Sequence, residues 1–115
     1  MLVIRQAQLR ALEESQFQGW LIEHVRQFFP EWCARQATLG PVIAAGLARA
    51  RGHGFTEAAD LCRFVDLGCA FGEHFDEDVR LPWASELLHA REIIDATRRM
   101  DLLSAAARAQ LSTAA

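Results

Sequence analysis

The chain has 115 residues, of which 51% are hydrophobic and 23% charged, so a wholly disordered chain is excluded and one domain over residues 1–115 is expected. All 12 basic residues are arginines, and 15 carboxylates bring the formal net charge to −3. A mildly acidic chain has no broad basic face for a phosphate backbone, which argues against nucleic acid as the main partner.

The first residues do not resemble a targeting segment. The apolar run before Arg5 is four residues long, too short for a secretory signal. No window approaches the roughly 18 apolar residues that would cross a bilayer. Three cysteines, an odd number without a closely spaced pair, favour a reducing compartment over a disulfide framework. We therefore expect a cytoplasmic protein without a membrane partner.

Good helix formers dominate the chain, and strand-like alternation is nearly absent along it. The first helix is predicted over residues 6–29, with a break near Ser15 as an alternative. Its inner stripe is expected to consist of Phe17, Trp20, Leu21, Val25 and Phe28. Pro30 ends this helix, and a short helical turn follows over residues 31–36.

Two further helices are predicted in the middle of the chain. One covers residues 41–51, with Pro41 in its first turn and Gly52 or Gly54 as its C-terminal cap. The next covers residues 57–71, with Thr56 as N-cap and Gly72 as its end. A loop over residues 72–80, a short helix over 82–89 and a last helix over 95–111, capped by Asp95, complete the chain.

The helix predicted over residues 57–71 is apolar around most of its circumference. Its polar residues are Asp60, Arg63 and Asp66, which we expect to form a surface stripe of ion pairs. The alternative is that Arg63 or Asp66 faces an interface and orients a partner. A helix of this kind must be largely buried, either at the centre of its domain or beneath another protein. The chain is thus predicted to be all-α, a compact single-domain bundle of about five helices.

The predicted loop carries a cluster of charged groups: Glu73, His74, Asp76, Glu77 and Asp78. Carboxylates beside a histidine suit a hard metal ion or acid–base chemistry. The segment lacks the ligand spacing and the internal glycine of an EF-hand loop, however. We therefore expect a solvated acidic connector.

The thiols and imidazoles also invite a metal interpretation, because Cys33, Cys62 and Cys69 accompany four histidines, His24, His53, His74 and His89. Structural zinc sites usually take two ligands from one tight turn, and this spacing is missing. We expect buried thiols that behave as apolar groups, without a metal or other cofactor. The common nucleotide-binding and hydrolase motifs are absent as well, so the sequence predicts no enzyme and no catalytic residue.

Several aromatic residues lie in or beside predicted loops, and a chain of this length leaves much of its surface exposed. They either close over the core or anchor a partner. Met1–Ile4 is either a staple onto the first helix or an extended segment that pairs with a partner's sheet. The residues that we predict to contact a partner are Phe64, Leu67, Phe71, Phe75, Trp83 and Asp66.

The central part of the chain resembles a family of small bacterial proteins. The shared pattern consists of Cys62, Phe64, Asp66, Leu67, Gly72, Phe75, Asp76 and residues 81–84, with further matches at residues 4–9, 28–30 and 100–103. The chain departs from it at Gly68, where a bulky apolar residue is commoner. Proteins of this kind are encoded beside the VgrG and PAAR spike genes and the effector chaperones of type VI secretion systems.

The resemblance implies an accessory adaptor or co-chaperone that helps to load a toxin effector, and it implies no catalytic residues. The expected partner is an effector, an effector chaperone or a spike protein, bound by the 57–71 helix and the loop aromatics. A homo-oligomer is also compatible with the sequence. The alternative function is that of an immunity protein whose acidic loop blocks a toxin's basic cleft. A small metal-dependent enzyme would require a bound metal.

Overall fold

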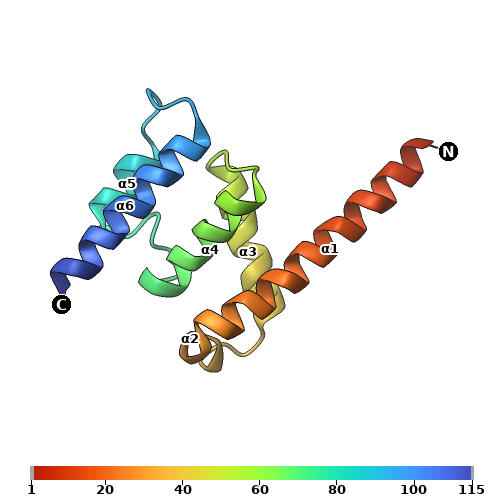
Figure 1. Cartoon of the computed structure of the whole chain (residues 1–115), viewed down its shortest axis with the longest axis horizontal. Helices are drawn as coiled ribbons and strands as arrows, with labels where there is room; N and C mark the ends of the chain where they lie inside the picture. Colours follow the sequence, from red (N-terminus) through yellow and green to blue (C-terminus); the bar gives the residue numbers. More distant parts are fainter. Residues whose placement is uncertain (1, 115) are drawn as a thin grey trace. The chain divides into compact units, whose positions relative to one another are not determined.

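The computed structural model describes the backbone of residues 2–114 and the side chains of residues 13–113. Over this range the chain forms six helices and no strand (Figure 1), which confirms the all-α prediction. The helices are α1 (Leu2–Phe28), α2 (Pro30–Ala34), α3 (Leu39–Gly52), α4 (Ala58–Phe71), α5 (Pro82–Leu88) and α6 (Ala96–Ala114). Within the described range, none of these helices combines the length and apolar character needed to span a membrane.

The contacts of the chain divide it into two compact units, residues 1–44 and residues 45–115. Unit 1 contains α1, α2 and the beginning of α3, and unit 2 contains the rest of α3 and the other helices. That the whole chain forms a single domain stays a prediction. The backbone is already helical at residues 2–4, so an extended N-terminal segment is wrong; a staple through side chains 1–4 lies outside the described residues.

Unit 1 consists mainly of α1, which continues through Ser15 without the break considered from the sequence. The flanking residues explain this, because Glu14 and Gln18 are good helix formers joined by a side-chain hydrogen bond of 3.2 Å. Pro30 ends α1 as predicted and occupies the first turn of α2, where its missing N–H costs no hydrogen bond. α2 then packs against α1.

The end of α3 is closed by Gly54, the second of the two glycines predicted to cap it. Gly54 has a φ of +95°, which L side chains rarely adopt. The N–H of Phe55 donates to the carbonyl of Ala50 at 3.2 Å, and that of Gly54 donates to Arg51 at 3.0 Å. These two bonds form a Schellman motif, and its usual apolar contact is supplied by Phe55 and Ala50, both fully buried.

α4 begins one residue later than predicted and ends where expected. Its N-cap is Glu57 in an extended conformation, so the prediction of Thr56 is wrong; no side-chain cap bond is formed there. Gly72 closes the helix with a φ of +117° and donates its N–H to the carbonyl of Gly68 at 2.9 Å. Leu61, Phe64, Val65 and Leu67 are buried, as the apolar circumference of this segment predicts.

The core of unit 2 is built around a chain of three phenylalanine rings. Phe64 of α4 lies between Phe55 and Phe75, with ring centroids 6.0 and 5.0 Å away. α6 packs against both α4 and α5, and Met100 and Leu103 of α6 are fully buried. The Oδ1 atom of Asp95 accepts the N–H of Thr97 at 3.0 Å, which confirms Asp95 as the N-cap of α6.

The polar stripe of α4 is not the surface stripe that the sequence suggested. Asp60 is only 1% exposed, and it accepts bonds from Arg63 at 2.8 Å and from the hydroxyl of Thr97 at 2.6 Å. Arg63 also donates to Asp101 at 2.9 Å, so the expected ion pair forms but extends onto α6. Because α6 packs against α4, Asp60 is buried here, whereas Arg63 and Asp101 stay partly exposed.

Candidate functional site

Three of the residues predicted to contact a partner belong to the core of unit 2. Phe64 and Phe75 are 2% and 1% exposed, and Leu67 is buried as well. In the described conformation these side chains stabilise unit 2, and their contact with a partner stays a prediction. An apolar residue on a mostly apolar helix, like Phe64 or Leu67, or in a loop, like Phe75, has the same sequence signature whether it points inward or outward.

Phe71 and Trp83, also predicted, are half-buried and contact one another. Their rings meet edge to face, with centroids 5.2 Å apart and an interplanar angle of 73°. The indole N–H of Trp83 is buried without a hydrogen-bond acceptor. A buried donor without a partner is uncommon in folded proteins, and Nε of Arg49 is a second such donor in unit 2. Asp66, the last predicted residue, is half-buried on α4.

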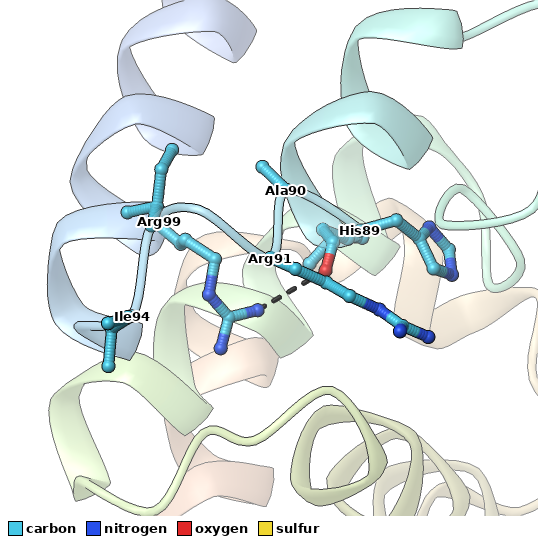
Figure 2. A pocket seen from close by; sticks show the side chains of 7 residues that line it. His89, Ala90, Arg91, Ile94 and Arg99 are labelled. Atoms are coloured by element: carbon cyan, nitrogen blue, oxygen red, sulfur yellow. Dashed lines mark hydrogen bonds between the residues drawn. The ribbon is translucent and has the colours of Figure 1, made fainter.

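Described residues of unit 2 line a first and a second hollow. The first, of about 480 Å³, is lined by Phe71, Gly72, His74, Phe75, Glu77, Asp78 and Arg80. The second, of about 260 Å³, lies between the end of α5 and the first turn of α6 (Figure 2). The first brings two predicted contact residues together with the charged loop, whereas nothing in the sequence analysis pointed to the second.

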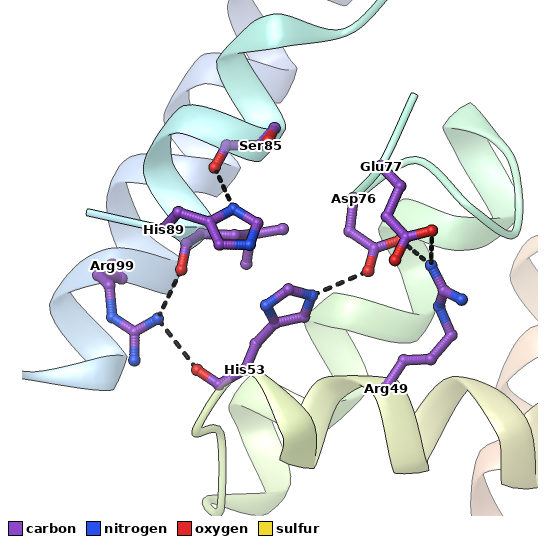
Figure 3. Close-up of polar contacts among 8 residues, drawn as sticks. Arg49, His53, Asp76, Glu77, Ser85, His89 and Arg99 are labelled. Carbon is purple, nitrogen blue, oxygen red and sulfur yellow. Dashed lines mark hydrogen bonds and ion pairs between the residues drawn. The ribbon is translucent and has the colours of Figure 1, made fainter. Parts of the chain in front are cut away.

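Asp76 is the centre of a polar network in the loop (Figure 3). Its carboxylate, 2% exposed, is paired with the guanidinium group of Arg49 and lies 2.8 Å from Nε2 of His53. Burial opposes ionisation, but the bonds and charges of His53 and Arg49 outweigh it and lower the pKa of Asp76. An ionised carboxylate only accepts, so Nε2 of His53 donates. The expectation of a wholly solvated connector is therefore wrong at Asp76.

Asp78 is neutralised in a different way, on the surface. It accepts two bonds from the guanidinium group of Arg80, at 3.1 and 2.8 Å, and one from the Arg80 backbone N–H at 2.9 Å. These bonds lower the pKa of Asp78 to about 2. Glu77 also lies 3.9 Å from Nη2 of Arg49, so three of the four loop carboxylates are paired with arginines. Glu73 and Glu77 are both exposed.

His53 links the Asp76 network to the second hollow. Its ring stands edge-on to that of His89, with centroids 5.6 Å apart, and Nδ1 of His89 donates to the carbonyl of Ser85 at 2.8 Å. The carbonyl of His53 accepts a bond from Nη1 of Arg99 at 3.0 Å (Figure 3). A continuous set of polar contacts therefore joins α3, the loop, α5 and α6 within unit 2.

The cysteines form no disulfide bond, in agreement with the sequence analysis; all three lie within the described side chains and are half-buried rather than buried. Burial and the charge of Asp66 raise the pKa of the Cys62 thiol to about 11. A thiol protonated at neutral pH is a weak nucleophile. This supports the interpretation of Cys62 as an apolar group.

Two largely exposed aromatic side chains, Trp20 and Phe28, lie on α1, within the stripe that the sequence predicts to face inward. Phe17, Trp20, His24 and Phe28 form a row, here called the α1 aromatic row. Successive ring centroids are 6.3, 5.2 and 4.9 Å apart, and Trp20 and Phe28 are 56% and 60% exposed. Leu21 and Val25, assigned to the same stripe, are fully buried.

The sequence contained a signal for this separation. At 3.6 residues per turn, Trp20 and Val25 are about 140° apart around the helix, too far for both to lie at the centre of one buried face. The stripe is therefore two adjacent faces, one aliphatic and buried, the other aromatic and partly exposed. Among the other described side chains, Val79, Ile94 and Leu111 are exposed apolar residues.

Comparisons with protein-family models, curated proteins and solved structures found no match.

Proposed function

We propose that this chain is a non-enzymatic interaction protein, an accessory adaptor or co-chaperone in the loading of a type VI secretion effector. The observation that carries the proposal is the α1 aromatic row, two of whose members have more than half of their surface exposed. The proposed partner is the effector, its chaperone or a spike protein, as the family resemblance implies.

A row of stacked rings suits this role for two physical reasons. Scattered apolar residues are ordinary on protein surfaces, but a continuous aromatic patch is typical of a protein contact. Rings already stacked on a helix also lose little conformational freedom on binding, and tryptophan is prominent among the residues that dominate binding energy. The proposal therefore assigns the main contact to α1, whereas the sequence analysis assigned it to the segment that forms α4.

The immunity alternative depends on the charge of the 72–80 loop, and the loop geometry favours the adaptor. A segment that fills a basic cleft needs carboxylates that are available to the toxin. Asp76 is buried against Arg49 and His53, and Asp78 is paired with Arg80. Glu77 is exposed but lies 3.9 Å from Nη2 of Arg49, so among the described side chains Glu73 is the loop carboxylate without an ion pair, a weak counterpart for a nuclease cleft.

The test is co-expression of the tagged chain with the products of the adjacent effector, chaperone and spike genes, followed by affinity purification. We expect one of these products to co-purify in a stoichiometric amount. Recovery of none of them would contradict the adaptor function. In a parallel assay, cells that express the adjacent toxin are not expected to survive when the chain is co-expressed; rescue would support immunity instead.

A further inference from the structure

The second hollow has an unusual charge environment. It is lined by Leu88, His89, Ala90, Arg91, Ile93, Ile94 and Arg99. Two arginines and a histidine therefore contribute to the lining, and no carboxylate does. Glu92 and Asp95 belong to the same connecting segment but do not line the hollow, and Asp95 is engaged as the cap of α6.

Arg99 differs from the other half-buried arginines. Arg49 and Arg63 each form an ion pair with a buried aspartate. Arg99 instead donates from Nη1 to two backbone carbonyls, those of His53 at 3.0 Å and Leu88 at 3.2 Å, and among the described side chains no carboxylate pairs with it. Its guanidinium group also lies over the ring of Phe55, 5.3 Å from the centroid. The positive charge is thus held in place without a counter-ion.

The remaining donors of Arg99 make no hydrogen bond with the described part of the chain. Nη1 makes both protein bonds, which leaves the N–H groups of Nε and Nη2 without an acceptor in the described part of the chain. Figure 2 shows the guanidinium group extending from α6 toward the segment after α5, where Arg91 is also located. A fixed guanidinium group with unused donors suits a carboxylate, which it binds through paired hydrogen bonds.

The rest of the lining is apolar. Leu88 is 5% exposed and forms the base, whereas Ile94 is 92% exposed at the rim. The volume of about 260 Å³ lies below the roughly 300–1,000 Å³ of sites for drug-sized ligands, so one amino-acid residue or a small acid would fill it. An apolar wall beside an unpaired cation is complementary to a ligand with a charged end and a branched hydrocarbon end.

We propose that this hollow binds a carboxylate attached to a branched apolar group, either the C-terminal residue of a peptide chain or a free small acid. The carboxylate pairs with Arg99, Arg91 adds positive charge at the edge of the hollow, and the hydrocarbon contacts Ile93, Ile94 and Leu88. The site lies wholly within unit 2 and does not depend on the α1 aromatic row, so it stands or fails independently of the proposed function.

The experiment is an NMR titration of the full-length ¹⁵N-labelled chain with four probes: 4-methylpentanoate, acetyl-Gly-Leu, acetyl-Gly-Leu amide and inorganic phosphate. We expect saturable shifts at residues 88–99 with one or both carboxylates, and none with the amide. A response to 4-methylpentanoate alone identifies a free acid, and a response to acetyl-Gly-Leu alone identifies a chain end. Equal binding of the amide, a response to phosphate alone, or no response to either carboxylate would overturn the proposal.

Substitutions of exposed side chains test the location of the site without destabilising the fold. Arg91→Gln and Ile94→Ser change exposed side chains, and each is expected to weaken carboxylate binding about tenfold. Arg98→Gln is the matched control, because Arg98 is an exposed neighbour that does not line the hollow. Unchanged affinity in both test variants, or an equal loss in Arg98→Gln, would contradict the assignment. This test does not need an Arg99→Gln variant, which would remove the central guanidinium group and could fail to fold.

Discussion

At the scale of single residues, Asp76 stabilises unit 2 through a network that joins segments distant in the sequence. Its substitution by Asn leaves the guanidinium group of Arg49 without its buried counter-ion. We expect Asp76→Asn to lower the free energy of unfolding at pH 7 by about 2–4 kcal/mol, as measured by urea denaturation. Asp78→Asn is the control, because its surface pair with Arg80 should leave the urea midpoint unchanged. Equal effects of the two would contradict the network.

The same residue predicts a pH dependence. The pKa of Asp76 is lower in the folded chain than its ordinary value of 3.8, so the unfolded chain binds the proton more readily. The stabilisation is therefore fully present above the unfolded pKa and disappears as the pH falls through the lower, folded pKa. Urea midpoints measured from pH 6 down into this acid range should fall more steeply for the wild type than for Asp76→Asn. Parallel curves would contradict this sign.

Two glycines are expected to respond to alanine in opposite directions. At Gly54 the φ of +95° is strained for alanine, and a Cβ would lie 3.1 Å from Nη2 of Arg99, so Gly54→Ala should cost about 1–2 kcal/mol. At Gly68, inside α4, a Cβ would meet nothing within 4 Å, so Gly68→Ala should stabilise by about 0.5–1 kcal/mol. Thermal unfolding measures both, and stabilisation by Gly54→Ala would refute the Schellman assignment.

Local residue roles could be predicted from sequence because their partners are close along the chain. Asp95 as a cap and Gly72 as a helix end each involve bonds within four residues. Asp76 could not be assigned in this way, because its partners Arg49 and His53 are 27 and 23 residues away. A carboxylate in a charged loop has the same sequence signature whether it is solvated or buried against a cation.

At the scale of the elements, the Asp60 network fixes α4 against α6. Thr97→Val removes the hydroxyl that donates to buried Asp60, and we expect a loss of about 1–2 kcal/mol in unfolding free energy. Asp101→Ala removes the outer partner of Arg63, whose carboxylate is 53% exposed, and should cost at most about 1 kcal/mol. Denaturant titration compares the two, and a larger loss for Asp101→Ala would contradict the central place of Asp60.

The burial of α4, and the face of α1 that is buried, show what helical periodicity can and cannot predict. α4 is apolar around most of its circumference, so its burial followed from the pattern alone. α1 has an apolar sector wide enough for two faces, and the pattern does not state which face is covered. Leu21 and Val25 are buried, whereas Trp20 and Phe28 are largely exposed. Tertiary packing, and not local helix propensity, determines which of the two faces is buried.

At the scale of the whole molecule, none of the large exposed apolar side chains in the described part of the chain belongs to α4. Among the described side chains, the large exposed apolar residues are Trp20, Phe28, Val79, Ile94 and Leu111. Only Trp20 and Phe28 belong to a continuous row of rings, and this distinction makes α1 the surface that we assign to a partner. The sequence analysis expected excess apolar surface and assigned it to the segment that forms α4.

The most direct measurement of this claim is the affinity of the co-purified partner for the wild type and for a Trp20→Ser/Phe28→Ser double variant, by isothermal titration calorimetry. Loss of two aromatic anchors should weaken binding at least about tenfold, since such anchors each contribute about 1–2 kcal/mol or more. Helicity and thermal stability should change little, because both side chains are mostly exposed. Val79→Ser/Leu111→Ser, which removes isolated exposed residues, should bind like the wild type. Unchanged affinity in the Trp20/Phe28 variant, or an equal loss in the control, would contradict the account.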